Sequence, residues 1–309
     1  MTGRQWTLDD IPDLAGRTAF VTGVTSGLGE HTVLELARKG ARVVMAARSE
    51  TKLRSAIDDV KRMLPQAELV PLVLDLADLS SIRRGAEEAR RLGPLDILIN
   101  NAGVMATPHR RTPDGFELQF GTNHLGHFAL TGLLFPQLAE AESARVVTVA
   151  SQAHRIARTV PLGDPRHDTG QYQRWVAYAQ SKLANLLFAF ELDRRARAAA
   201  TRVLSMAAHP GYAATNLFDG MNLGGTRPDG AIAVGATRLL AQPAAMGAQP
   251  ALMAATMPGL PGGSYVGPRG FAEMRGKPTL VTASRTALDA ELARKLWAVS
   301  EDATHVRFP

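Results

Sequence analysis

The sequence contains no cysteine among its 309 residues. This absence excludes disulfide bonds, cysteine nucleophiles and zinc sites with cysteine ligands, and it is consistent with a reducing compartment. Aromatic residues are scarce, at 6%, and they do not alternate with Lys or Arg as the base-stacking surface of a nucleic-acid-binding protein would. No apolar stretch of about eighteen residues lacks both a charge and a proline, so we expect no membrane span.

Charge of one sign does not dominate either. The chain has 35 Lys and Arg against 29 Asp and Glu, which gives a formal net charge of +6. This excess either keeps the protein soluble or marks a site for nucleic acid or a phosphorylated ligand, and the scattering of the basic residues favours solubility. Residues 1–11 are polar and carry acids, so we expect no signal peptide. The expectation is a cytoplasmic protein that binds no nucleic acid.

Apolar strand segments alternate with helical segments along the chain. With 45% hydrophobic residues the chain can bury a large core. Its strands are continuously apolar, which indicates a parallel sheet covered on both faces. We expect a surface lead-in over 1–16 and a single Rossmann-type α/β domain over 17–309, with a doubly wound, seven-stranded parallel sheet and helices on both faces. The predicted strands cover 18–22, 41–46, 69–74, 95–99, 145–150, 202–207 and 264–266.

Helical periodicity predicts the elements between these strands. The segment about 216–257 is rich in Ala, Met, Gly and Pro and reads as helical in pieces, over 231–241 and 243–257. Its apolarity suits a hydrophobic substrate, and a core or a dimer contact explains it equally well. Residues 267–309 are expected to form a C-terminal extension. The remaining predicted helices cover 30–39, 50–63, 78–91, 114–139, 175–199 and 286–300.

A glycine-rich turn follows the first strand and precedes the first helix. In this context backbone N–H groups and the positive end of a helix face the pyrophosphate of a dinucleotide. The glycines are separated by a gap of three residues and then a gap of one, which differs from the G-x-G-x-x-G fingerprint. The phosphate-binding residues predicted here are Gly23, Thr25, Ser26, Gly27, Leu28 and Gly29.

The end of the second strand bears on the choice of cofactor. An NAD site usually has an acid here for the ribose 2′-hydroxyl, but this chain has Arg48. Arg48 can pair with a 2′-phosphate through its planar fork, or it is an ordinary solvent-facing arginine. We therefore expect NADP(H) to be preferred, with NAD(H) as the other option. At the end of the third strand, Asp75 can accept a bond from adenine beside Leu76, and a helix cap is its structural alternative.

Tyr178 and Lys182 are four residues apart in a helical segment, so their side chains lie over one face. At ~4 Å and an effective dielectric of ~20, a neighbouring cation stabilises a phenolate by about 4 kcal/mol, or about three pKa units. This predicts that Tyr178 exchanges a proton near neutral pH. Ser151 stands at the carboxyl end of the fifth strand, the edge of an open α/β sheet that binds ligands.

The predicted helix over 114–139 contains three polar residues of interest, Asn123, His124 and His127. Two histidines three apart can suggest a metal site, but no carboxylate or third ligand completes the set. We interpret both histidines as structural and expect no metal site. Asn123 is notable as a polar residue in an otherwise apolar helix.

These motifs stand in an order that resembles the short-chain dehydrogenases/reductases over about residues 16–215. The resemblance rests on the glycine turn, Asn100-Asn101-Ala102-Gly103, Asn123, Ser151, Tyr178-x-x-x-Lys182 and Pro210-Gly211. The segments 123–128 and 263–268 are similar to the retinol dehydrogenase branch, although the N-terminal hydrophobic anchor usual in its animal membrane members is not seen here. The resemblance implies an oxidoreductase that transfers a hydride between a nicotinamide and a small-molecule carbonyl/alcohol pair. The expected substrate is hydrophobic: a retinal-like, aliphatic, terpenoid or steroid carbonyl.

The resemblance also implies a role for each residue. Tyr178 would be the general acid/base, and Lys182 would lower its pKa and hold the nicotinamide ribose. Ser151 would donate to the substrate oxygen, and Asn123 would anchor a water beside Lys182. Members of the family commonly pair through the helices over 114–139 and 175–199, so a homo-dimer or homo-tetramer is expected. The other residues that would contact the cofactor are Asp75, Leu76, Asn101, Ala102, Gly103, Pro210, Gly211 and Thr215.

One alternative belongs to a different class of function. A cofactor-binding regulatory protein can keep this fold with little or no turnover. The joint presence of the four predicted catalytic residues argues against it, because a protein that only binds cofactor has no chemical need for all of them.

Overall fold

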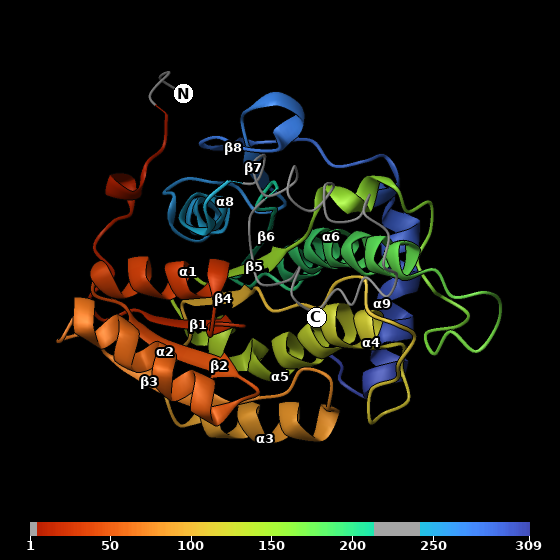
Figure 1. Ribbon diagram of the computed structural model, residues 1–309, viewed down its shortest axis with the longest axis horizontal. Coiled ribbons are helices and arrows are strands. Elements are labelled where there is room, and N and C mark those ends of the chain that lie inside the picture. The colour runs from red at the N-terminus through yellow and green to blue at the C-terminus, as the bar shows by residue number, and fades with distance from the viewer. Residues whose placement is uncertain (1–4, 213–241) are drawn as a thin grey trace, which may run out of the picture.

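The computed structural model describes residues 5–212 and 242–309. Within them, strands form one sheet of eight in the order β3-β2-β1-β4-β5-β6-β7-β8 (Figure 1). The strands are β1 Thr18–Thr22, β2 Arg42–Ala47, β3 Leu69–Val73, β4 Ile97–Asn100, β5 Arg145–Val149, β6 Leu204–Ala208, β7 Tyr265–Pro268 and β8 Pro278–Leu280. The principal helices are α1 Gly27–Arg38, α2 Glu50–Met63, α3 Leu79–Arg90, α5 Gly126–Glu140, α6 Arg174–Ala198, α8 Ala244–Thr256 and α9 Ala290–Thr304.

The seven predicted strands are confirmed, and they pair in parallel with one another. The prediction of seven strands is nevertheless wrong, because β8 extends the sheet and runs antiparallel to β7. This strand has only three residues and begins with Pro278, so it offers no periodicity that a sequence pattern can detect. Both edge strands contain a proline, Pro71 in β3 and Pro278 in β8.

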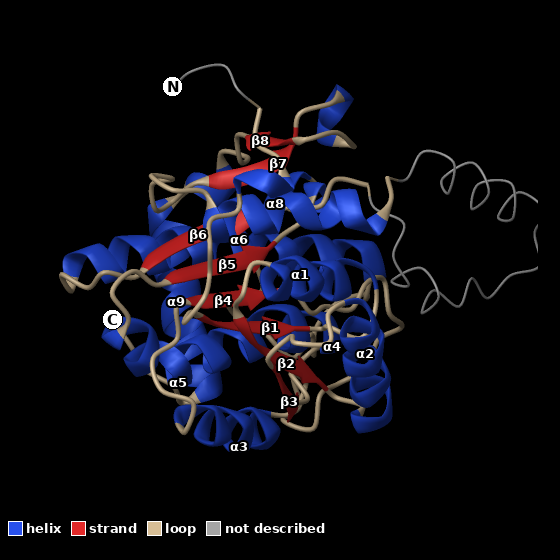
Figure 2. Cartoon of the chain, turned by 90° about the vertical axis from the view of Figure 1, so that its left-hand side faces the viewer, coloured by secondary structure: helices blue, strands red, loops and turns tan. Residues whose placement is uncertain are grey.

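Helices cover both faces of the sheet, as Figure 2 shows. Successive side chains of a strand point to opposite faces, so in β1 Val21 belongs to one core cluster and Phe20 to another. The first cluster includes apolar residues of α1, α2 and α8, and the second includes residues of α3, α5, α6 and α9. This alternation explains why the strands are apolar without interruption.

The predicted surface lead-in over 1–16 is partly wrong. Trp6, Ile11 and Leu14 are buried in the core cluster that also contains residues of α1. The Leu14 amide donates to the carbonyl oxygen of Lys39 at 2.7 Å. The described part of the lead-in is therefore packed against the end of α1.

The predicted helix over 114–139 begins later than expected and is not uniform. Residues 112–116 form a turn, in which the Thr112 amide donates to the Phe116 carbonyl at 2.8 Å. The Glu117 carboxylate then caps the short α4 Leu118–Phe120 by accepting from two of its amides. A π-helical turn over Gly121–Leu125 leads into α5. Such turns are rare and often occur at functional sites.

The described helices of the C-terminal half agree with the predictions, with one exception. The predicted piece over 243–257 is confirmed as α8, whereas the piece over 231–241 lies outside the described residues. The helix predicted over 286–300 is divided into a 3-10 turn, Thr286–Leu288, and α9, because the Asp289 carboxylate caps α9 as a new helix. No helix in the two described ranges is both long enough and apolar enough to span a membrane.

Candidate active site

The glycine-rich turn joins β1 to α1 and packs against the segment that follows β4. Gly23 has φ +71°, a left-handed conformation that glycine adopts without strain. A Cβ at this position would lie 2.8 Å from the Cα of Ala102. The close approach of these two backbones therefore requires glycine at position 23.

The N-terminus of α1 points its first amides into the same region. Ser26 is the N-cap residue, with an extended backbone, and its side chain makes no capping hydrogen bond. The first N–H groups of a helix have no partner within the helix. This end of α1 is therefore suited to bind an anionic group, as a pyrophosphate site requires.

A cavity of about 730 Å³ opens beside this turn, within the range of ~300–1,000 Å³ that is usual for small-molecule sites. Most of the predicted cofactor residues line it: Gly23, Thr25, Ser26, Leu28, Gly29, Arg48, Asp75, Leu76, Asn101, Ala102 and Gly103. Gly27, Pro210, Gly211, Tyr178 and Lys182 are not lining residues, and Thr215 lies outside the described residues. Sequence reasoning missed several others: Ser49, Lys52, Val104, Met105, Thr107, Leu118 and Thr122.

Two cationic side chains lie at one end of the cavity, where β2 ends. Arg48 and Lys52 are both exposed and both line it. Between them, the Ser49 hydroxyl caps α2 by accepting from the Lys52 amide at 3.4 Å. Lys52 lies four residues after Arg48, a spacing that can bring side chains together at the start of a helix, and this spacing could have identified it.

Asp75 does not have the capping role that was its structural alternative. Asp78 caps α3 by accepting from the amides of Ser80 and Ser81. The Asp75 Oδ1 instead accepts from the Ala77 amide at 2.9 Å, within the loop that lines the cavity. This hydrogen bond fixes the Asp75 carboxylate at the cavity wall.

A buried hydrogen-bond chain joins the end of β1 to the π-helical turn. The Thr22 hydroxyl accepts from the amides of Asn101 and Ala102, each at 3.0 Å, and lies 2.9 Å from the His127 Nε2. The His127 Nδ1 lies 2.9 Å from the Asn123 carbonyl oxygen, which can only accept. The proton is therefore on Nδ1, and Nε2 accepts from Thr22. Burial lowers the pKa of His127 to about 4, so the ring is neutral.

Hydrogen bonds of the Asn123 side chain connect the cavity wall to α6. Its Oδ1 accepts from the Val104 amide at 2.8 Å, and its Nδ2 donates to the Val104 carbonyl and to the Ser181 hydroxyl, both at 2.9 Å. Both atoms of the amide are therefore in use. His124 has a structural partner as well, since its Nε2 lies 2.8 Å from the Ser300 hydroxyl.

Lys182 is buried behind the cavity wall, with 4% of its surface exposed. Its ammonium donates to the Val149 carbonyl at 3.1 Å. A Cβ placed on Gly103, which lines the cavity, would lie 3.5 Å from the Lys182 Nζ. Burial lowers the pKa of Lys182 to about 8.

Tyr178 lies on the same face of α6, and the Lys182 Nζ is 5.8 Å from the centre of its ring. Burial raises the pKa of the Tyr178 phenol to about 12, and a hydrogen bond with the Ser151 side chain opposes this rise. The prediction that Lys182 brings this pKa close to neutrality was therefore wrong for the protein alone. Loss of hydration on burial is the larger effect.

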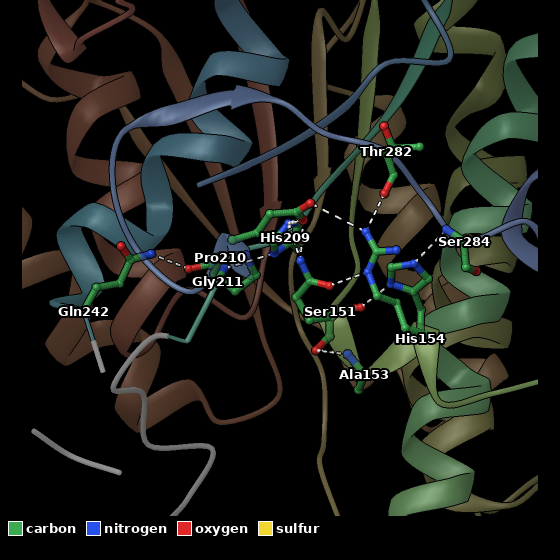
Figure 3. Close-up of polar contacts among 12 residues, drawn as sticks. Ser151, Ala153, His154, His209, Pro210, Gly211, Gln242, Thr282 and Ser284 are labelled. Atoms are coloured by element: carbon green, nitrogen blue, oxygen red, sulfur yellow. Dashed lines mark hydrogen bonds and ion pairs between the residues drawn. The ribbon is translucent and has the colours of Figure 1, made fainter. Parts of the chain in front are cut away.

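Ser151 follows β5 and is held from both sides. Its hydroxyl accepts from the Ala153 amide at 3.2 Å, and its carbonyl accepts from the His154 Nδ1 at 2.7 Å (Figure 3). The His154 Nε2 accepts in turn from the Ser284 amide at 3.2 Å. Burial lowers the pKa of His154 to about 4, which keeps the ring neutral. Sequence reasoning missed His154, whose partner Ser284 is distant in the sequence.

The predicted catalytic side chains thus converge at the carboxyl edge of the sheet. Ser151 lies near enough to Tyr178 to oppose the rise in the pKa of its phenol, and the Lys182 ammonium lies 5.8 Å from the Tyr178 ring centre. Asn123 donates a hydrogen bond to Ser181, the residue that precedes Lys182. Asn123 and Lys182 of this group lie directly behind Gly103, at the wall of the cavity that the glycine turn opens. The arrangement can donate a proton to an oxygen atom beside a bound dinucleotide.

Comparisons with known proteins agree with this geometry. Residues 17–162 match the family described as short chain dehydrogenase. The chain is 38% identical over 291 residues to retinol dehydrogenase 13 of Homo sapiens, covering 93% of this chain and 84% of that protein. It is 40% identical over 299 residues to polyprenol dehydrogenase of Mus musculus, with the same coverage of 93% and 84%.

A solved structure is similar over the whole fold. The crystal structure of an uncharacterized protein from Mycobacterium paratuberculosis has a TM-score of 0.82 and 44% sequence identity, covering 99% of this chain and 100% of that one. These relatives confirm the resemblance found in the motifs. The chain belongs to the short-chain dehydrogenase/reductase family, in its retinol dehydrogenase-like branch, and is an NAD(P)-dependent oxidoreductase.

Proposed function

We propose that this oxidoreductase uses NADP(H) and interconverts a hydrophobic carbonyl compound and its alcohol. The observation that carries the proposal is that Ser151, Tyr178 and Lys182 lie near one another, with the Lys182 ammonium directly behind Gly103 in the cavity wall. When bound, the cofactor supplies or accepts the hydride. The protein's own residues bind the cofactor and the substrate, orient them, and exchange the proton.

Tyr178 acts as the proton donor in the direction of reduction. Its pKa of about 12 keeps the phenol protonated at neutral pH, as a general acid requires. The Ser151 hydroxyl, which opposes the rise in the pKa of this phenol, provides a second donor for the substrate oxygen. Lys182, with a pKa of about 8, is mostly cationic at neutral pH, and its charge favours the phenolate that remains after the proton has left.

Two cations support the preference for NADP(H). Arg48 and Lys52 line the cavity at the end of β2, and neither forms a salt bridge within the described ranges. A 2′-phosphate carries the negative charge that such a pair recognises, whereas a ribose hydroxyl carries none. The only acid among the cavity's described lining residues is Asp75, which lies in the loop after β3 rather than at the end of β2.

Apolar side chains support a hydrophobic substrate. Trp175 and Val176 remain 46% and 40% exposed at the start of α6, and the Trp175 ring lies 6.3 Å from that of Tyr178. Val104 and Met105 line the cavity. The named relatives are a retinol and a polyprenol dehydrogenase, so a long isoprenoid-like aldehyde or ketone is the first candidate.

The test is NADPH oxidation by purified protein, followed by absorbance with retinal and with aliphatic, terpenoid and steroid carbonyls. We expect turnover with at least one apolar carbonyl and a lower KM for NADPH than for NADH. No oxidation with any of them would favour the regulatory protein that binds cofactor without turnover. Light scattering in the same buffer tests the proposed homo-dimer or homo-tetramer.

A further inference from the structure

A partly buried carboxylate outside the reacting group joins two segments of the site. Glu273 lies in the 3-10 turn Phe271–Glu273, in the connection between β7 and β8. Its Oε2 is 3.0 Å from the His209 Nε2 and also accepts a hydrogen bond from the Gln152 side chain. Gln152 directly follows Ser151, and His209 directly precedes Pro210. One carboxylate therefore contacts the neighbours of two predicted site segments.

His209 uses both of its ring nitrogens. The ring is fully buried, and its Nδ1 accepts from the Gly211 amide at 3.2 Å (Figure 3). Because an amide can only donate, Nδ1 carries no proton, and the proton on Nε2 is directed to Glu273. The carboxylate thus selects the tautomer that can hold the Gly211 amide.

The turn that His209 holds has little freedom on its other side. Gly211 has φ +67°, and a Cβ there would collide with the Met274 carbonyl oxygen. That same oxygen accepts from the Tyr212 amide at 2.7 Å. The Pro210 carbonyl accepts from the buried Gln242 side chain. The turn is therefore held between the imidazole and the β7–β8 connection.

Gln152 links the same carboxylate to the Ser151 side of the site. Its Oε1 accepts from the Arg155 Nε at 2.8 Å. The Arg155 guanidinium also lies 3.6 Å from the Glu273 Oε1 and donates to the Thr282 carbonyl at 2.6 Å. Hydrogen bonding from His209 lowers the pKa of Glu273, which favours its ionised form. The ionised form accepts from both partners at once.

We propose that Glu273 and His209 are positioning residues, which set the spacing between Ser151 and the Pro210–Gly211 turn. Glu273 acts through Gln152 on one side and through His209 on the other. The proposal rests on the proposed function, since it takes Ser151 as the donor to the substrate and the turn as a wall for the nicotinamide. Displacement of a reacting group by about 1 Å can cost about 100-fold in rate, so this spacing affects turnover more than binding at the adenosine end.

The test compares Glu273→Ala with Glu273→Gln in the full-length protein. Alanine removes the acceptor, whereas the glutamine amide oxygen can still accept from His209 and Gln152. We expect Glu273→Ala to lower kcat with NADPH and retinal about 10- to 100-fold and to increase the isotope effect from deuterated NADPH. Affinity for 2′,5′-ADP, which probes only the adenosine end, should change less than about twofold, while affinity for NADPH falls about fivefold. Glu273→Gln should recover most of both losses.

The matched control is Glu68→Ala, which removes a glutamate that pairs with Arg42 at 2.8 Å, beside β2 and β3. It should leave all of these values unchanged. If Glu273→Ala does not fold, as judged by its melting transition, two other variants replace it. Gln152→Leu removes the hydrogen bond from Gln152 to Glu273, and His209→Asn removes the one from His209. For each we expect the same losses of kcat and of NADPH affinity. Wild-type kcat and NADPH affinity in a folded variant would overturn the positioning role, and so would an equal loss in Glu273→Ala and Glu273→Gln.

The failure of this proposal differs from the failure of the proposed function. If Tyr178→Phe is inactive while Glu273→Ala is normal, only the positioning role is wrong. If no carbonyl is turned over, the proposed function is wrong, and the ratio of NADPH to 2′,5′-ADP affinity still tests the positioning of the turn.

Discussion

The side chain of Asn123 forms two hydrogen bonds with the backbone of one residue, Val104, accepting from its amide at 2.8 Å and donating to its carbonyl at 2.9 Å. A backbone strand would pair in the same way. Val104 lines the cavity, so a side chain from the π-helical turn takes the place of a neighbouring strand at the cavity wall.

Replacement of Asn123 by alanine leaves the Val104 amide and carbonyl without these partners. Unsatisfied buried groups cost about 1–3 kcal/mol, so the free energy of unfolding in urea should fall by about that amount, and NADPH affinity should fall with it. Gln137→Ala is the control, because its amide is buried and donates to two carbonyls away from the cavity, those of Ala89 and Gly93. A similar loss of stability with unchanged NADPH affinity is expected there. Equal NADPH affinities in both variants would contradict the role of Asn123.

Replacement of Tyr178 by phenylalanine removes one hydroxyl from a buried ring. A general acid typically contributes about 100- to 10,000-fold in rate, so kcat should fall by about 100-fold or more. NADPH binding, followed by fluorescence, should persist, because Tyr178 does not line the cavity. Ser181→Ala alters a neighbouring hydroxyl on α6 and should retain more activity. Turnover of Tyr178→Phe at the wild-type rate would exclude Tyr178 as the acid.

Replacement of Arg48 or Lys52 by alanine tests the preference for NADP(H). Hydrogen bonds to charged groups contribute about 1.5–3 kcal/mol, so the KM for NADPH should rise about 10- to 100-fold for Arg48→Ala. The KM for NADH should change little. Arg54→Ala is the control, since Arg54 lies on α2 and pairs with Glu50 away from the cavity. Equal effects of Arg48→Ala on the two cofactors would remove the argument for a 2′-phosphate.

The neutral His127 predicts how stability changes with pH. Burial lowers its pKa to about 4 from the ordinary 6.5, so between these values the unfolded chain binds more protons than the folded protein. Stability therefore rises with pH in this window and is lost as pH falls from 6.5 to 4. The loss in wild type should exceed that in His127→Gln by about 1–3 kcal/mol. Urea unfolding at several pH values measures this difference. Substitution of the exposed His305 by asparagine should leave the slope unchanged.

Sequence patterns predicted the elements that repeat and the residues that stand at their ends. The seven parallel strands have continuous apolar runs, and Ser151 or Arg48 follows directly from the place where a run stops. The patterns could not predict contacts between distant segments. Glu273 and His209 are 64 residues apart, and neither has a local signature. The pKa of Tyr178 was mispredicted for a related reason: the spacing to Lys182 is local, whereas the burial that raises the pKa depends on segments distant in the sequence.

The prolines of the two edge strands affect how copies of the protein can associate. Pro71 in β3 and Pro278 in β8 each remove an amide donor from the outermost strands, and open strand edges are the usual template for continuous sheets between molecules. Addition of a further strand at either margin would leave carbonyl groups without donors. Both described edges of the sheet therefore disfavour the continuous pairing of strands from one molecule to the next.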